Sequence, residues 1–140
     1  MIRVLIADDD ASLRQVLGLL VQLEDDFQLV GTVADGQEAV DQVRQLRPDV
    51  VMMDLDMPRL DGFAATQRIR AMPGAPPVLI ISNTFDDDTV RRALELGAGG
   101  FVAKPDAYSE LAAAIREVSR SKRYFSQALA EWRSRNSSIG

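Results

Sequence analysis

Short apolar segments recur along the chain, and each is followed by a polar break and a stretch with helical spacing. The clearest is Val50–Met53, which runs directly into Asp54. Four consecutive apolar residues at this length are typical of a strand buried on both faces, as in parallel sheets covered by helices. The five segments are residues 4–7, 27–34, 50–53, 78–81 and 101–103. Their alternation with helices predicts an α/β fold with right-handed crossovers.

A helix is expected after each strand. The first is predicted to begin at a cap on Asp10 or Ser12 and to run to about Glu24, and the second to end before Pro48. The sequence Gly97–Gly100 ends a helix and enters a strand, the reverse of a phosphate-binding loop, so it predicts a helix cap and tight turn. The residues expected to line the fifth helix are Tyr108, Leu111, Ile115 and Val118.

Residues 1–121 are predicted to form one domain, followed by a helical extension or linker over residues 122–140. Phe125, Leu129 and Trp132 give that extension a weak helical pattern. Six basic and two acidic residues lie between positions 116 and 135. This excess indicates either a solvated helix face or a linker towards a further module.

The chain holds neither cysteine nor histidine. Disulfides, thiolate or imidazole metal sites and serine–histidine catalysis are therefore excluded, and any covalent chemistry must use a carboxylate, a hydroxyl or a lysine. The net charge of −5 disfavours direct nucleic-acid binding by this domain. No apolar run reaches membrane-spanning length and the first residues do not form a signal peptide, so we expect a cytoplasmic protein without membrane contact.

Polar residues follow four of the predicted strands. Asp8 and Asp9 follow the first, Asp54 the third, Ser82 the fourth and Lys104 the fifth. We adopt the strand order 2-1-3-4-5 by analogy with doubly wound folds of this length. In that order these four strand ends are neighbours, and their side chains are expected to meet.

The chemical types of these residues complement one another. Carboxylates held close together repel unless a cation neutralises them, and a site with only oxygen ligands suits Mg²⁺. Such an ion lets the carboxylate of Asp54 approach a phosphoryl group as a nucleophile and form an aspartyl phosphate. Lys104 supplies a compact positive charge, and Ser82 supplies a hydroxyl donor.

The chain resembles response regulator receiver domains over roughly residues 2–120. The motifs that carry the resemblance are Val4–Asp9, Met53–Gly62, Leu79–Ser82 and Gly97–Pro105. The resemblance implies a flavodoxin-like (CheY-like) fold with a five-stranded parallel sheet in the order 2-1-3-4-5. Gly99-Gly100 and Arg123–Ser126 are most similar to receivers of the NarL/LuxR type, whose members usually continue into a helix-turn-helix DNA-binding domain.

The resemblance also implies roles for the site residues. Asp54 would accept a phosphoryl group from a histidine kinase, and Asp9 and Asp54 would bind Mg²⁺ directly. The backbone carbonyl of Asp56 would be a third ligand, and Asp8 would act largely through water. Ser82 and Lys104 would contact the phosphoryl group, with a cis peptide bond joining Lys104 to Pro105. The domain would thus assist its own phosphorylation and dephosphorylation without being an enzyme.

Receivers of this family pair the hydroxyl of the fourth strand with an aromatic residue on the fifth. Ser82 and Phe101 hold these positions, so phosphorylation is expected to draw Ser82, Asn83 and Thr84 towards the site and to change the surface of helix 4, strand 5 and helix 5. A permanently buried Phe101 is the alternative. Homodimerisation, and an output domain beyond the C-terminus or on a separate protein, stay open.

Two other functions also fit part of this residue pattern. Haloacid-dehalogenase-like phosphatases also use an Asp-x-Asp motif with a later serine and lysine, a pattern that Asp54, Asp56, Ser82 and Lys104 fit. Pro58, the place of the motif on the third strand and the unexplained Asp8-Asp9 pair oppose that function. A pseudo-receiver that only docks partners would need none of these polar residues. The sequence therefore favours a phosphorylated receiver.

Overall fold

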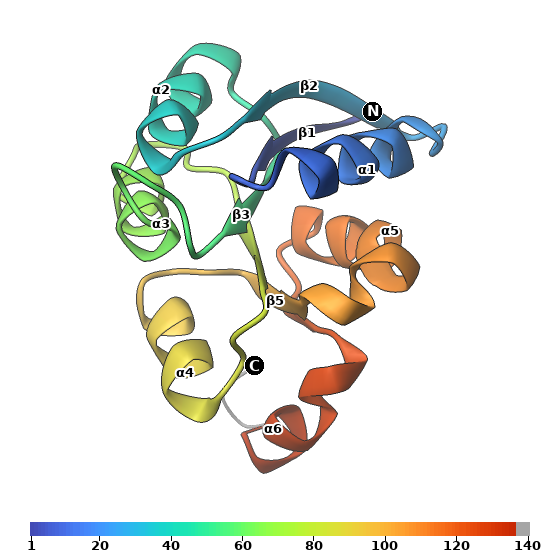
Figure 1. The fold of residues 1–140 in the computed structure, drawn as a ribbon, viewed down its shortest axis with the longest axis vertical. Coiled ribbons are helices and arrows are strands. Elements are labelled where there is room, and N and C mark those ends of the chain that lie inside the picture. The colour runs from blue at the N-terminus through green and yellow to red at the C-terminus, as the bar shows by residue number, and fades with distance from the viewer. Residues whose placement is uncertain (137–140) are drawn as a thin grey trace.

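The computed structural model describes residues 1–136 and confirms the predicted α/β fold (Figure 1). Six parallel strands of this part of the chain form one sheet in the order β2-β1-β3-β4-β5-β6. The strands are β1 (Ile2–Ala7), β2 (Phe27–Val33), β3 (Val50–Asp54), β4 (Val78–Ser82), β5 (Gly100–Ala103) and β6 (Tyr124–Phe125). The five predicted strands have the predicted order, and β6 adds a short strand beyond β5.

Six α-helices and two 3₁₀ turns connect or follow the strands within residues 1–136. They are α1 (Ala11–Gln22), α2 (Gly36–Leu46), α3 (Gly62–Arg70), α4 (Asp87–Glu95), the turn η1 (Lys104–Asp106), α5 (Ala107–Ser119), the turn η2 (Gln127–Leu129) and α6 (Ala130–Arg135). Asp10, Asp35, Asp61 and Asp86 cap α1 to α4, each side chain accepting a backbone N–H of the first turn. No helix described here is both long enough and apolar enough to cross a membrane.

Helices cover both faces of the sheet, with α1 and α5 on one side and α2, α3 and α4 on the other (Figure 1). Alternate residues of one strand therefore enter different cores. Val4 and Ile6 of β1 pack in the cluster that holds Ile115 of α5, whereas Leu5 packs in the cluster that holds Val40 of α2. Burial on both faces explains why the strands are continuous apolar runs.

The prediction that Tyr108 lines α5 is wrong. Its side chain is 58% exposed, and Ala107 is buried in its place. Ala107, Leu111 and Val118 follow helical spacing along the buried face, and a residue one position further on is turned by about 100° towards solvent.

The weak helical pattern predicted for the extension is correct only in part. Tyr124 and Phe125 pair in parallel with Gly100 and Phe101, so the extension begins as an edge strand. A two-residue strand is defined by hydrogen bonds to a distant neighbour, which local periodicity does not reveal. Helix α6 then buries Trp132, and residues 137–140 of the predicted extension lie outside the described residues.

Candidate functional site

The carboxyl ends of β1, β3, β4 and β5 lie level at one edge of the sheet. Asp54 is in register with Ile81, and Ser82 with Ala103. The structure thereby brings the predicted site residues to one edge, and these are Asp8, Asp9, Asp54, Ser82 and Lys104.

Three carboxylates form the centre of the site. Asp8, Asp9 and Asp54 each offer an oxygen, and these oxygens all lie within 4.8 Å of one another. Asp8 and Asp54 are 1% and 2% exposed, whereas Asp9 is exposed to solvent. The cluster is therefore open on the side of Asp9 and closed behind Asp8 and Asp54.

Lys104 supplies the positive charge of the site. Its Nζ lies 3.5 Å from Asp8 Oδ2 and 3.4 Å from Asp54 Oδ1, and its side chain is 16% exposed. These are ion-pair distances at the long limit of hydrogen bonding. One ammonium group thus faces two buried carboxylates and cannot neutralise both.

Because these charges do not balance, the pKa values of Asp54 and Lys104 are both shifted. Burial, and then the neighbouring carboxylate of Asp8, raise the pKa of Asp54 to about 7, against the opposing effect of Lys104. Burial by itself lowers the pKa of Lys104, but the carboxylates of Asp54 and Asp8 outweigh it and the pKa is raised. Lys104 is therefore cationic at neutral pH, and Asp54 needs a further positive charge to be fully ionised there.

The donor set fits a small divalent cation. Asp8 Oδ2 and Asp54 Oδ2 are buried without a hydrogen-bond partner, which is costly for carboxylate oxygens. The other oxygens are held in place, since Asp8 Oδ1 accepts the backbone N–H of Asp10 at 2.8 Å. A hard cation with oxygen ligands would satisfy the two orphaned atoms and offset the repulsion among the three carboxylates.

Two further predicted residues lie behind and beside the carboxylates. Ser82 is fully buried, and its Oγ accepts the backbone N–H of Thr84 at 3.0 Å. Phe101 is also fully buried, in the same apolar cluster as Ile80 and Val90. In this structure the aromatic side chain of β5 therefore points into the core.

Asp56 lies at the mouth of the crevice, where its backbone N–H is 3.4 Å from Asp54 Oδ1. Its own side chain is exposed.

The predicted cis bond before Pro105 is wrong, because the structure has no cis peptide among the residues described. Lys104–Asp106 forms a 3₁₀ turn with proline in its first turn, a position that proline's fixed φ suits, and Lys104 reaches both carboxylates from this geometry.

A glycine sets the distance between β3 and α3. A Cβ atom on Gly62 would lie 2.1 Å from the carbonyl oxygen of Asp54 and 2.7 Å from the Cα of Leu55. Only glycine lets the first turn of α3 approach the backbone of Asp54 this closely. Gly62 is thus a packing requirement of the site.

No sequence pattern indicated the ion pair that lies beside the carboxylate cluster. Arg59 follows the site motif with a left-handed φ of 64°, and its guanidinium binds Asp35 Oδ2 at 2.7 Å and 3.0 Å. Asp35 also caps α2. Arg59 and Asp35 are 24 positions apart, so only the fold reveals that this contact fastens the β3–α3 loop.

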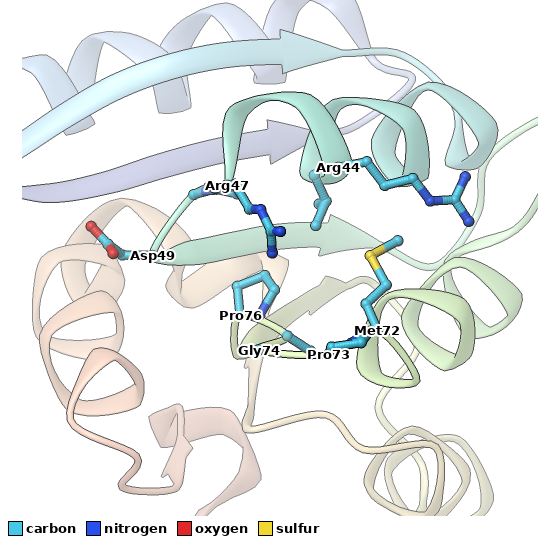
Figure 2. A pocket seen from close by; sticks show the side chains of 10 residues that line it. Arg44, Arg47, Asp49, Met72, Pro73, Gly74 and Pro76 are labelled. Carbon is cyan, nitrogen blue, oxygen red and sulfur yellow. The ribbon is translucent and has the colours of Figure 1, made fainter.

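A pocket at the opposite end of the sheet has a different character (Figure 2). It encloses about 380 Å³ between the α2–β3 and α3–β4 loops, and Arg44, Arg47, Met72, Pro73 and Pro76 are among its lining residues. The carboxylate cluster lies at the carboxyl ends of the strands and contributes none of the residues of this pocket. This pocket is therefore separate from the predicted site, which has its own opening of about 500 Å³ lined by residues that include Asp9 and Asp56.

Comparison with known proteins agrees with this geometry. The model of the family described as the response regulator receiver domain matches residues 4–116. A protein-glutamate methylesterase/protein-glutamine glutaminase of Symbiobacterium thermophilum is 46% identical over 105 residues, which are 74% of this chain and 29% of that protein. Transcriptional regulatory protein DesR of Bacillus subtilis is 36% identical over 131 residues, 94% of this chain and 65% of that protein.

Among solved structures, a LuxR-family two-component response regulator from Aurantimonas sp. SI85-9A1 superposes with a TM-score of 0.87 at 32% identity, covering 92% of each chain. This chain spans only between 29% and 34% of the length of four methylesterase relatives that it matches. The family match, by contrast, covers most of the chain, including both buried carboxylates and Lys104. The chain belongs to the response regulator receiver domain family.

Proposed function

We propose that Asp54 accepts a phosphoryl group from a histidine kinase in a Mg²⁺-dependent reaction. Asp8, Asp9, Asp54 and the backbone carbonyl of Asp56 would hold the ion, which when bound supplies the positive charge that the attack on an anionic phosphoryl group requires. The single observation that carries this proposal is the pair of buried, orphaned oxygens on Asp8 and Asp54 beside Lys104.

The chain's own residues would position and stabilise the transfer. One Asp54 oxygen attacks the phosphorus atom, the bond from phosphorus to the histidine nitrogen breaks, and the imidazole leaves with that electron pair. Lys104 and the hydroxyl of Ser82 would then bind phosphoryl oxygens. Because Ser82 Oγ now accepts from Thr84, contact with the phosphoryl group would draw the β4–α4 loop towards the site.

Phe101 is the proposed second half of the switch. It stands on β5 beside Ile80 of β4, two residues before the position in register with Ser82. The surface of α4, β5 and α5 would thus respond to phosphorylation through a shift between existing conformations.

For the whole protein we propose transcriptional regulation as the output. The match to DesR extends over 94% of this chain, whereas the match to the Symbiobacterium methylesterase covers 74%. The alignment with this transcriptional regulator therefore includes residues of the extension. A LuxR-type DNA-binding domain, encoded with this chain or on a neighbouring gene, would support this output, and a methylesterase domain in the same protein would contradict it.

A phosphodonor assay tests the proposed reaction. With Mg²⁺ and acetyl phosphate, intact mass should show one phosphoryl group per chain, and Asp54→Asn should show none. Chelation of the metal should also abolish the modification. Asp49→Asn is the matched control, because Asp49 is an exposed aspartate at the opposite end of the sheet.

Two outcomes would contradict the proposal. Repeated turnover of a generic phosphate ester, lost in Asp56→Asn, would indicate a haloacid-dehalogenase-like phosphatase. Absence of both Mg²⁺ binding in the millimolar range and phosphorylation would indicate a pseudo-receiver that serves only to dock partners.

A further inference from the structure

The C-terminal extension, here residues 122–136, is fastened to the edge of the sheet next to the proposed switch. Beyond the strand pair, the backbone N–H of Ser126 donates to Phe101 O at 3.1 Å. Ser126 Oγ accepts the backbone N–H of Ala103 at 2.9 Å, and this serine is 1% exposed. A buried side-chain hydrogen bond thus extends the ladder to the last residue of β5.

The extension also reaches the two helices that flank β5. On α5, Glu110 accepts the Tyr124 hydroxyl at 2.5 Å and the backbone N–H of Gln127 at 3.0 Å. On α4, Asp87 binds Arg135 at 2.6 Å, which places α6 beside α4 (Figure 1). The extension therefore pairs with β5 and contacts α5 and α4, the elements whose surface phosphorylation is proposed to change.

Phe101 packs against the extension from inside. Phe101, Leu129 and Trp132 belong to one buried apolar cluster, and the rings of Phe125 and Trp132 lie 5.3 Å apart. Phe101 is in register with Phe125. An outward movement of the Phe101 side chain would require this part of the extension to leave the edge.

A short covalent and hydrogen-bonded path joins the extension to the phosphorylation site. Lys104, which contacts Asp54, directly follows Ala103 in the chain. Ala103 is in register with Ser82 and donates its N–H to Ser126. The residue that holds the extension thus lies between the two groups proposed to bind phosphoryl oxygens.

We propose that the C-terminal extension is coupled to phosphorylation and docks more tightly on β5 when Asp54 carries a phosphoryl group. This inference rests on the proposed function. Phosphoryl oxygens would give Lys104 and Ser82 fixed partners and so immobilise the end of β5. An extension that docks on an already ordered edge loses less conformational entropy, which makes the coupling positive.

The docked extension contains one polar group that the protein does not satisfy. Trp132 is 4% exposed, and its Nε1 is buried without a hydrogen-bond acceptor. A buried donor without a partner costs stability, which offsets part of what the docking contacts contribute. A change at β5 that strengthens or weakens docking would shift the population of docked chains.

The coupling is reciprocal by thermodynamic linkage. If phosphorylation tightens docking, loss of a docking contact must weaken binding of a phosphoryl analogue by the same factor. Ser126→Ala removes the acceptor for Ala103, and we expect it to weaken binding of beryllofluoride with Mg²⁺ by about 3- to 10-fold. Ser109→Ala is the matched control, since Ser109 is an exposed serine of α5 whose hydroxyl bonds only to Asp106 O.

Trp132 is the only tryptophan in the chain, so its fluorescence reports directly on the extension. In the intact chain, acetyl phosphate with Mg²⁺ should lower the quenching of Trp132 by acrylamide and slow hydrogen exchange of peptides within residues 122–136 by at least about threefold. Circular dichroism checks that Ser126→Ala is folded, and the exchange measurement on the unmodified sequence needs no variant.

Intact mass measured on the same samples separates the possible failures. Phosphorylated chains whose extension exchanges at an unchanged or faster rate would overturn this inference and leave the proposed function standing. Chains that take up no phosphoryl group would overturn both. Equal beryllofluoride affinities for Ser126→Ala and Ser109→Ala would also contradict the coupling.

Discussion

The two ends of the parallel sheet hold their charged side chains in different ways. At the amino ends, the guanidinium of Arg3 donates to the carbonyl oxygens of Leu46 and Arg47 at 2.7 Å and 2.8 Å. At the carboxyl ends, Asp8 and Asp54 are buried, and each has an oxygen without a hydrogen-bond partner. Charge at the first end satisfies backbone groups, whereas the two carboxylates at the second are only partly satisfied by Lys104 and by backbone N–H groups.

This difference distinguishes a structural arrangement from one built to bind a ligand. A pocket of about 380 Å³ near Arg44 and Met72 lies at the satisfied end (Figure 2), and one of about 500 Å³ that includes Asp9 and Asp56 lies at the other end. Buried polar atoms without partners are rare in folded proteins, because each costs stability. The less satisfied end is therefore where an external cation and a phosphoryl group would contribute most.

The largest effect is expected when a glycine at the carboxyl ends of the strands is substituted, compared with a glycine at the amino ends. Gly62→Ala should lower the free energy of unfolding by more than about 3 kcal/mol and reduce phosphorylation, because its Cβ would meet the backbone of Asp54 and Leu55. Gly74→Ala, in the opposite pocket, meets nothing within 4 Å and should cost only about 1 kcal/mol for its φ of 66°. Urea denaturation measures both, and equal costs would contradict the close approach of α3 to the site.

The second prediction concerns the charge on Asp54. In chelating buffer at pH 8, Asp54→Asn should raise the free energy of unfolding by about 1–3 kcal/mol, because a buried charge and its repulsion with Asp8 are removed. The pKa of Asp54 is about 7 in the folded protein and 3.8 as its ordinary value. The raised pKa means that stability is lost as the pH rises from about 4 through about 7.

Urea denaturation at both pH values should accordingly show that Asp54→Asn raises the free energy of unfolding less at pH 5 than at pH 8. Asp49→Asn provides the comparison from the amino ends, where the exposed carboxylate accepts the backbone N–H of Arg3 at 2.8 Å. We expect it to change stability by less than about 1 kcal/mol and to lower it. A destabilised Asp54→Asn at pH 8 without metal would show that the carboxylate cluster is satisfied after all.

The smallest effect is expected at the amino ends. Arg47 ends α2 with a left-handed φ of 51°, so Arg47→Gly should raise the free energy of unfolding by about 0.5–1 kcal/mol. Arg44→Gly, inside the same helix, should lower it by about 1 kcal/mol. Thermal unfolding distinguishes the two, and neither variant should alter phosphorylation by acetyl phosphate. A loss of phosphorylation would show that the two ends are coupled.

Much of the fold and the site was predictable because it is encoded locally. An apolar run such as Val50–Met53 is short and continuous wherever a strand is buried on both faces. Parallel strands place their carboxyl ends at one edge, so a polar residue after each run predicts a shared site. Asp8, Asp54 and Lys104 meet for this reason.

Features that depend on distant partners were not predictable. The β6 strand exists because the edge of β5 offers hydrogen bonds to Tyr124 and Phe125. The exposure of Tyr108 depends on the rotational phase of α5 against the sheet. The trans bond before Pro105 depends on the turn in which that residue lies.

By itself the sequence determined the strands, their order by analogy, and the residue types that gather at the carboxyl ends. Only the tertiary structure decided that Asp54 and Asp8 keep orphaned oxygens, that Arg59 binds Asp35, and that the C-terminal extension covers β5. The physical reason is the separation along the chain between the residues that interact. Strand formation follows from neighbours along the chain, whereas desolvation and charge balance follow from groups that only folding brings together.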